Sequence, residues 1–234
     1  MNLDDLTIVV PTRDEERNIF CFLDSIPSQI NLIVVDAGSD RTANLVHLLR
    51  PERSLVVKSS KRISAARHLG AKLAKTPWIL FTDADVHFSK DYFRIIQNIS
   101  LPDAVYGPKL SKDEFKSYYL KIAKWQAISD RVQIPSVSGS NFLVDRNVYF
   151  SCGGFDQGLV VNEDSELGWR IQRNGFKIFY NPDLVTYAHD HRRLYHGIAR
   201  KTFHSLLRCA LLYLNLMPDR WRLADWGYWN TSFK

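Results

Sequence analysis

The stretch Trp78-Ile79-Leu80-Phe81-Thr82-Asp83-Ala84-Asp85 decides the fold class, because an apolar run of strand length ends in two carboxylates. The run is typical of a buried strand, and the carboxylates stand where that strand emerges from the core. Such a pair can hold a hard divalent cation against a diphosphate. A D-x-D is also common in surface loops, so the surrounding sequence has to decide between the two interpretations.

Two further apolar runs end in polar or acidic residues. Residues 6–10 lead into Pro11-Thr12-Arg13-Asp14-Glu15-Glu16, and residues 32–35 lead into Asp36-Ala37-Gly38-Ser39-Asp40. In parallel sheets, ligands bind outside the carboxyl ends of the strands. We therefore expect the three acidic loops to meet at one binding site.

Helix-like patterns separate these runs over 16–25, 41–49 and 64–75. The first begins with an acidic turn, the second has Ser39 or Asp40 as its expected N-cap, and Pro77 follows the third. The alternation of strands and helices indicates an α/β fold with a mostly parallel, Rossmann-like sheet between two helical layers.

The chain has 234 residues, 45% of them hydrophobic, which is enough for one substantial core. No linker-like composition divides it, so we expect one domain over 1–234. Its parts are a nucleotide-binding half (1–105), a less regular acceptor and catalytic half (106–190) and a basic amphipathic helical tail (191–234).

The cysteines, Cys21, Cys152 and Cys209, are far apart and odd in number, which predicts neither disulfides nor a zinc site. Acidic Asp4 and Asp5 precede an apolar stretch too short for a secretory signal, so we expect a cytoplasmic protein. The net charge of +6 comes with no nucleic-acid motif, which argues against a nucleic-acid partner.

The tail contains the apolar run 206–214, which Arg208 interrupts. The run is shorter than the ~20 residues that a membrane-spanning helix needs. Two interpretations remain open. The tail either lies peripherally on the inner face of an anionic membrane, or packs on its own domain with its basic side chains in solvent.

A second acidic cluster, Glu163-Asp164-Ser165-Glu166, stands where a helix is expected to begin near Glu163 or Asp164. Asp164 is either an N-cap or a catalytic base. Small residues at 139–141 suit a tight turn or a ligand pocket. The Trp side chains, Trp169 included, are either core residues or sugar-stacking platforms.

Seven motifs follow one another along the chain: Pro11-Thr12-Arg13-Asp14-Glu15-Glu16, Val34-Val35-Asp36-Ala37-Gly38-Ser39-Asp40, Ala65-Ala66-Arg67-His68-Leu69-Gly70-Ala71, Phe81-Thr82-Asp83-Ala84-Asp85, Gly139-Ser140-Asn141-Phe142-Leu143-Val144-Asp145-Arg146, Gly153-Gly154-Phe155-Asp156 and Glu163-Asp164-Ser165-Glu166-Leu167-Gly168-Trp169-Arg170. In this order they resemble the family 2 glycosyltransferases of the GT-A fold. The resemblance covers roughly residues 6 to 190.

The resemblance implies a metal-dependent, inverting transferase. It would move a sugar from a nucleoside-diphosphate donor, with UDP-sugars favoured over GDP-sugars, to a hydroxyl acceptor in polysaccharide or glycolipid synthesis. The implied cofactor is Mg²⁺ or Mn²⁺, and the basic tail favours a lipid-linked acceptor.

The resemblance also implies roles for single residues. Asp164 would be the catalytic base, Asp85 a metal ligand, and His189, or else His191, a second metal ligand. The local sequence pattern around His189 is equally consistent with a structural histidine that binds no metal. The implied donor-binding residues are Pro11, Thr12, Arg13, Glu15, Asp36, Gly38, Arg67, Asp83 and Ala84. The implied acceptor or sugar pocket comprises Gly139, Ser140, Asn141, Glu163 and Trp169.

The sequence departs from the family pattern at Arg13, Asp14 and His68, beside the expected nucleotide site, which puts the preferred base and sugar in doubt. Two other function classes stay open. A sugar-nucleotide nucleotidyltransferase would need a glycine-rich phosphate loop after the first strand, where Pro11 and Thr12 stand. A non-catalytic nucleotide-sugar binding protein would not need Asp164.

Overall fold

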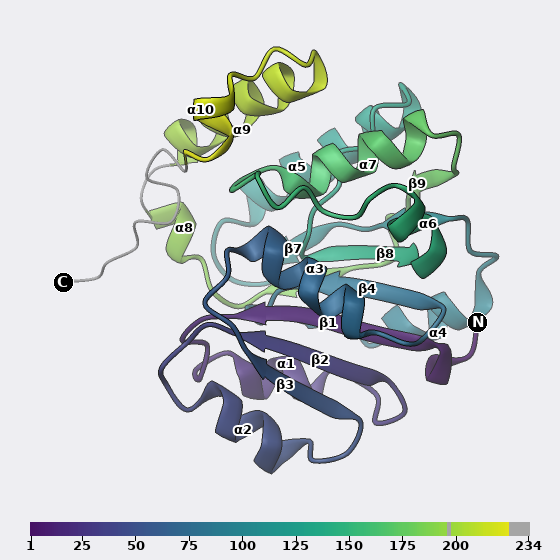
Figure 1. The fold of residues 1–234 in the computed structure, drawn as a ribbon, viewed down its shortest axis with the longest axis vertical. Helices are drawn as coiled ribbons and strands as arrows, with labels where there is room; N and C mark the ends of the chain where they lie inside the picture. Colours follow the sequence, from purple (N-terminus) through teal and green to yellow (C-terminus); the bar gives the residue numbers. More distant parts are fainter. Residues whose placement is uncertain (196–197, 225–234) are drawn as a thin grey trace.

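The computed structural model describes residues 1–195 and 198–224. Within them, one sheet has seven strands in the order β3-β2-β1-β4-β8-β6-β9, and a smaller sheet has the order β5-β10-β7 (Figure 1). The strands of the large sheet are β1 (Leu6–Thr12), β2 (Asn31–Asp36), β3 (Ser54–Lys58), β4 (Trp78–Thr82), β6 (Ala104–Tyr106), β8 (Asn141–Asp145) and β9 (Ile178–Tyr180). Those of the small sheet are β5 (Val86–Phe88), β7 (Lys109–Ser111) and β10 (Thr186–Ala188).

The large sheet is mostly parallel, as predicted. Strands β3, β2, β1 and β4 pair in parallel, β8 runs antiparallel to both β4 and β6, and β9 is parallel to β6. The three predicted strands lie in β1, β2 and β4. Sequence analysis missed β3, because this edge strand is only half-buried and its apolar run, Leu55-Val56-Val57, is short.

Helices cover both faces of the large sheet. Along β1, Ile8 and Val10 pack towards α1 (Ile19–Asp24), α2 (Thr42–Leu49) and α4 (Tyr92–Asn98), whereas Val9 packs towards α3 (Ile63–Leu73), α6 (Arg146–Ser151) and α7 (Glu163–Arg173). Successive strand residues point to opposite faces, so an apolar run without alternation fits a strand buried on both sides.

The first predicted helix begins later than expected. Residues 15–18 form a turn, in which the Asn18 amide donates to the Glu15 carbonyl at 2.9 Å, and α1 starts at Ile19. The Glu16 amide donates to the Asp40 carboxylate at 2.9 Å. Because of this hydrogen bond to the neighbouring loop, Glu16 does not form the acidic first turn of the helix that the sequence predicted. Asp40 also accepts from the Thr42 amide at the start of α2, at 2.9 Å.

Three helices of the C-terminal tail lie outside the sheet layers, beside α5 (Lys116–Arg131) and α7 (Figure 1). They are α8 (Arg192–Tyr195), α9 (Ile198–Tyr213) and α10 (Asp219–Arg222). Leu212 and Met217 of the tail pack against Leu159 and Trp169. The described part of the tail therefore packs on its own domain.

One basic residue of the tail contradicts the expectation of solvated charges. Arg208 is 2% exposed, and its Nη1 donates to the carbonyls of Trp221 and Ala224, both at 2.9 Å. Arg208 therefore holds the chain after α9 against the helix. Over the described part of the chain, no helix combines the length and apolarity needed to cross a membrane. Trp226 and Trp229 lie outside the described residues, and membrane association stays a prediction.

Candidate active site

A cavity of about 1260 Å³ lies at the carboxyl ends of the parallel strands. Its wall includes Pro11 and Thr12 at the end of β1, Ala37 after β2, and Asp83 and Asp85 after β4. It continues past α5, α7 and α9. The position is the one expected for an open α/β sheet, and the volume exceeds the usual upper size of a single-ligand pocket, about 1,000 Å³.

Arg67, on α3, joins the two acidic segments of the site. Its Nη2 donates to Asp83 Oδ1 at 2.7 Å, and its Nη1 donates to Glu163 Oε1 at 2.6 Å. Its side chain is only 3% exposed. The guanidinium therefore fixes the start of α7 relative to the end of β4, two segments far apart in sequence.

Asp164 lies on the cavity wall as the second residue of α7. The N-cap is Asn162, in a left-handed conformation with φ 64°, so the N-cap interpretation of Asp164 is wrong. Asp164 Oδ2 accepts from the Gly139 amide at 2.7 Å, and Oδ1 accepts from the Ser165 amide at 2.8 Å. These bonds fix the carboxylate in place.

Burial raises the pKa values of both neighbouring carboxyls, Glu163 and Asp164. The charge of Asp164 raises the pKa of Glu163 further, against the opposing effect of Arg67. For Asp164, the charge of Arg67 and the two amide bonds offset part of the effect of burial. A raised pKa makes a carboxylate a stronger base, which is what proton abstraction requires.

Gly139 packs directly on the Arg67 guanidinium. A Cβ at this position would lie 2.4 Å from Arg67 Nη1, and Arg67 is held by carboxylates on both sides. We expect Gly139→Ala to lower the free energy of unfolding by about 1–3 kcal/mol, the usual cost of overpacking. Urea denaturation measures it.

The control for that variant is Gly158→Ala, whose added Cβ would meet only the Asp156 carboxylate, at 3.1 Å. We expect the control to change stability by no more than about 0.5 kcal/mol. Equal losses of unfolding free energy in Gly139→Ala and Gly158→Ala would show that Gly139 and Arg67 are not tightly packed.

Both carboxylates of the D-x-D contact cations of the protein. Asp83 pairs with Arg67, and Asp85 Oδ1 accepts from Lys109 Nζ at 3.0 Å. Among residues 1–195 and 198–224, no group of three or more His, Cys, Asp or Glu side chains is arranged to hold a metal ion. Mg²⁺ commonly takes only one or two carboxylates and completes its shell with waters and phosphate oxygens. The carboxylate donors of Asp83 and Asp85 therefore fit a hard cation shared with a phosphate ligand.

The structure does not bring His189 to the cavity wall. Its amide donates to the Asp85 carbonyl at 2.8 Å, but its ring packs on His87, with ring centroids 4.3 Å apart. His191 does line the cavity, between the Tyr119 hydroxyl at 3.1 Å and the Asp113 carboxylate at 3.0 Å. Both histidines have protein partners, and a role as metal ligand remains a prediction for either.

Asp36 is fully buried directly behind the wall. Its Oδ1 accepts from the Thr12 hydroxyl at 2.8 Å and from the Gly38 amide at 3.0 Å, and its Oδ2 accepts from Lys58 at 2.6 Å. Asn141, also predicted to lie in the pocket, is not among the residues of the cavity wall, and its Nδ2 donates to the Leu184 carbonyl at 2.6 Å. The predicted residues that do line the cavity are Pro11, Thr12, Arg13, Glu15, Arg67, Asp83, Ala84, Asp85, Gly139, Ser140, Glu163, Asp164 and Trp169.

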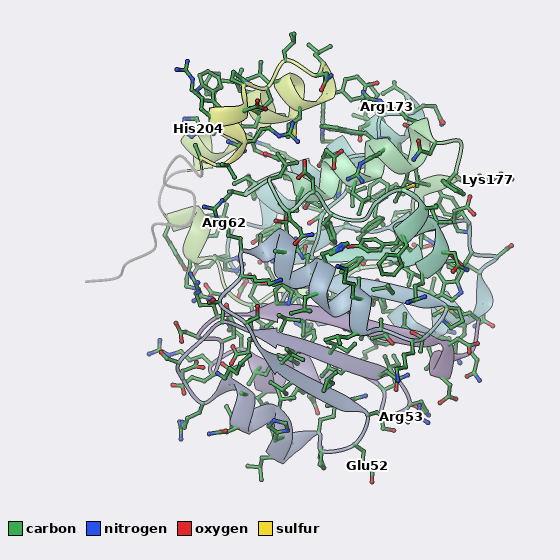
Figure 2. All side chains as sticks on the ribbon, in the orientation of Figure 1. Glu52, Arg53, Arg62, Arg173, Lys177 and His204 are labelled. Carbon is green, nitrogen blue, oxygen red and sulfur yellow. The ribbon has the colours of Figure 1, made fainter. Side chains whose placement is uncertain are left out.

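Sequence analysis missed several basic residues of the wall. Lys61 and Arg62 line the cavity at the start of α3, where Figure 2 shows Arg62, and Lys109 lines it from β7. Arg192 pairs with Glu15 at 2.7 Å. The run Lys58-Ser59-Ser60-Lys61-Arg62 is a detectable signal, but Lys109 stands in no recognisable motif. With Arg13, these side chains make one end of the cavity suitable for an anionic ligand.

Comparison with known proteins relates more than half of the chain to one family. The sequence model described as Glycosyl transferase family 2 matches residues 7–155. A Pre-mycofactocin glycosyltransferase of Mycobacterium tuberculosis is 26% identical over 220 residues, which cover 86% of this chain and 46% of that protein. The chain thus spans about half the length of the curated relatives it matches.

Solved structures share the fold at low sequence identity. The mannosyltransferase PcManGT from Pyrobaculum calidifontis, in complex with GDP-Man and Mn²⁺, aligns with a TM-score of 0.68 and 20% identity over 94% of this chain and 72% of its own. S. aureus TarS 1-349, in complex with UDP-GlcNAc, aligns with a TM-score of 0.69 and 16% identity over 97% of this chain and 72% of its own. The predicted GT-A fold is confirmed.

Proposed function

The chain belongs to glycosyl transferase family 2, and we propose on this basis that it transfers a sugar from a nucleoside-diphosphate donor to an acceptor hydroxyl. The observation that carries the proposal is the contact of Arg67 with Asp83 and Glu163, because it brings the D-x-D and Asp164 to one cavity. The GDP-Man and UDP-GlcNAc bound to the two similar structures support a nucleotide-sugar donor.

The donor is expected at the basic end of the cavity. Pro11 and Thr12 would flank the base, Arg13 and Arg62 would attract the diphosphate, and Ala84 would allow its close approach. Asp36 would act through Thr12 and Gly38, which it holds by hydrogen bonds. Both UDP and GDP remain candidates, with UDP preferred.

Asp85, with Asp83, would hold a divalent cation such as Mn²⁺, which when bound offsets the charge of the diphosphate leaving group. Support comes from the carboxylate donors on the wall and from the Mn²⁺ in the mannosyltransferase structure. Lys109 contacts Asp85 at 3.0 Å and adds a positive charge on the same side. It would also stabilise the anion that leaves.

Asp164 would accept the proton of the acceptor hydroxyl as its oxygen bonds to the anomeric carbon. The bond from that carbon to the diphosphate oxygen breaks on the opposite side, and the configuration inverts. The raised pKa of Asp164 and its fixed position on the wall support this role. Without a base, attack by a neutral hydroxyl is slow.

The pH dependence of turnover follows from the raised pKa values. Burial, followed by the charge of Asp164, raises the pKa of Glu163 to about 7, and burial raises the pKa of Asp164 as well. A carboxylate accepts a proton only when ionised. We therefore expect kcat to begin to fall, as the pH is lowered, while the pH is still above the ordinary carboxyl pKa of about 4.

Measuring kcat between about pH 4 and about pH 8.5 tests this expectation. A kcat that falls only near the ordinary carboxyl pKa of about 4 would rule out a base with a raised pKa.

The function itself is tested by incubating the protein and Mn²⁺ with UDP-GlcNAc and, separately, with GDP-Man, and by following nucleotide release chromatographically. Slow release of UDP or GDP, with water as acceptor, is expected for one of the two donors. Release from neither donor, combined with no binding of either nucleotide, would argue for a different activity.

A further inference from the structure

Beyond Asp164, the cavity continues into a space between α5, α7 and α9, here termed the helical chamber. Asn162, just before α7, donates to Ser205 Oγ at 3.1 Å and to Cys209 Sγ at 3.2 Å, which places α9 beside the start of α7. The chamber is therefore adjacent to Asp164. Its apolar lining includes Ile122, Trp125, Ile134, Val160, Trp169 and Tyr213.

The helical chamber differs in charge from the donor end. The donor end carries Arg13, Lys61 and Arg62 together with the acidic pair. By contrast, none of the described lining residues that α5 and α9 contribute is charged. A phosphate would leave its charge unmatched in such surroundings, whereas an uncharged group with a largely apolar surface would be matched.

Four buried polar atoms on lining residues of the chamber have no hydrogen-bond partner among the described residues: Gln126 Oε1, Asn162 Oδ1, Trp169 Nε1 and Thr202 Oγ1. Trp169 is 5% exposed and its indole Nε1 is unpaired. Gln126 is 2% exposed and its amide Oε1 is unpaired, although its Nε2 donates to the Ser136 carbonyl at 2.9 Å. Buried polar atoms are normally paired, so the indole N–H of Trp169 indicates a ligand that supplies an acceptor, and the amide oxygens of Gln126 and Asn162 indicate a ligand that supplies donors.

We propose that the helical chamber binds an acceptor with an apolar body, aliphatic or aromatic, attached to the hydroxyl that reacts at Asp164. This proposal rests on the proposed function and specifies its acceptor class. Trp169 and Gln126 make the polar contacts to that body, and the surrounding apolar side chains make the rest. The reacting hydroxyl lies at the mouth of the chamber, where the donor end begins.

Simple alcohols test the chamber without assuming a particular acceptor sugar. The affinities of n-butanol, n-hexanol, n-octanol and benzyl alcohol are measured by ligand-observed NMR, with UDP or GDP and Mn²⁺ present and absent. We expect affinity to rise about threefold for each added methylene, because each one is transferred from water to an apolar surface. The comparison of hexanol with benzyl alcohol distinguishes an aliphatic from an aromatic body.

Two neighbouring residues of α9 provide matched variants. Leu206 lines the cavity and is 51% exposed, so Leu206→Asp is compatible with folding. Leu207 is 37% exposed and is not part of the lining. We expect Leu206→Asp to weaken octanol binding at least about fivefold and Leu207→Asp to leave it unchanged.

Affinity that does not depend on chain length, or equal effects of the two variants, would overturn the proposal. These outcomes concern alcohol binding alone. Failure of both nucleotides to bind would instead count against the proposed function, because the nucleotide is measured in the same samples.

Discussion

Asp164→Asn is expected to lower kcat by roughly 100-fold or more while nucleotide binding is retained. The asparagine keeps the size of the side chain and one oxygen acceptor, so it can still accept from the Gly139 amide as Asp164 Oδ2 does, at 2.7 Å. It cannot accept the proton of a hydroxyl at neutral pH. A 100-fold loss corresponds to about 2.7 kcal/mol of transition-state free energy.

The comparison that isolates the base is Glu166→Gln. Glu166 lies on the same helix, bonds to Arg170 Nε at 2.8 Å and is absent from the cavity wall. The kcat of Glu166→Gln should remain within about twofold of the wild-type value, since a part-exposed ion pair contributes little to stability. Asp164→Asn with wild-type turnover would mean that another group takes the proton, or that no base is needed.

Arg67→Met is expected to lower the free energy of unfolding by about 3–5 kcal/mol, because it leaves buried carboxylates without their counter-charge. Glu163 has a side-chain exposure of 6%, and Asp83 of 20%, and both lose the cation that joins them. The start of α7 then loses its attachment to the end of β4. Donor binding and turnover should fall together.

The matched control is Arg94→Met, which removes an arginine from an exposed pair with Asp91. Solvent screens that pair, so we expect a loss of no more than about 1 kcal/mol. Guanidinium chloride denaturation of both variants provides the comparison. Similar small losses of unfolding free energy in Arg67→Met and Arg94→Met would show that the Arg67 contacts do not hold the site together.

Much of the fold could be predicted because apolar strands carry a local signal. Buried on both faces, β1, β2 and β4 show continuous Val, Ile and Leu runs, and their acidic termini mark the ligand edge. The half-buried strand β3 has such a run over only three residues, 55–57, and the start of α1 depends on the contact of Glu16 with Asp40. Neither gives a strong local signal.

In the candidate site, too, some residues could be predicted from local motifs and others could not. Asp85, Asp164 and Arg67 follow motifs, so their positions on one cavity could be predicted. Lys109 comes from a short strand of the second sheet, and only the pairing of β7 with β10 brings it to Asp85. The family resemblance also implied His189 as a metal ligand, and the packing of its ring on His87 depends on the pairing of β10 with β5, which no local motif shows.

The helical chamber shows a further limit. The amphipathic pattern of the tail predicted a helix, but not that α9 would close a cavity beside Asp164. That depends on Asn162 reaching Ser205 and Cys209 across more than forty residues of chain. The buried Arg208 depends likewise on the carbonyls of residues beyond the helix.

Donor binding is tested most directly by isothermal titration calorimetry of UDP and GDP, with and without Mn²⁺, on the wild-type protein and on Asp85→Asn. We expect one nucleotide to bind the wild type at least about tenfold more tightly with Mn²⁺, and this gain to disappear in Asp85→Asn. Failure of both nucleotides to bind, or an equal Mn²⁺ gain in the variant, would contradict a metal-dependent donor site at Asp85.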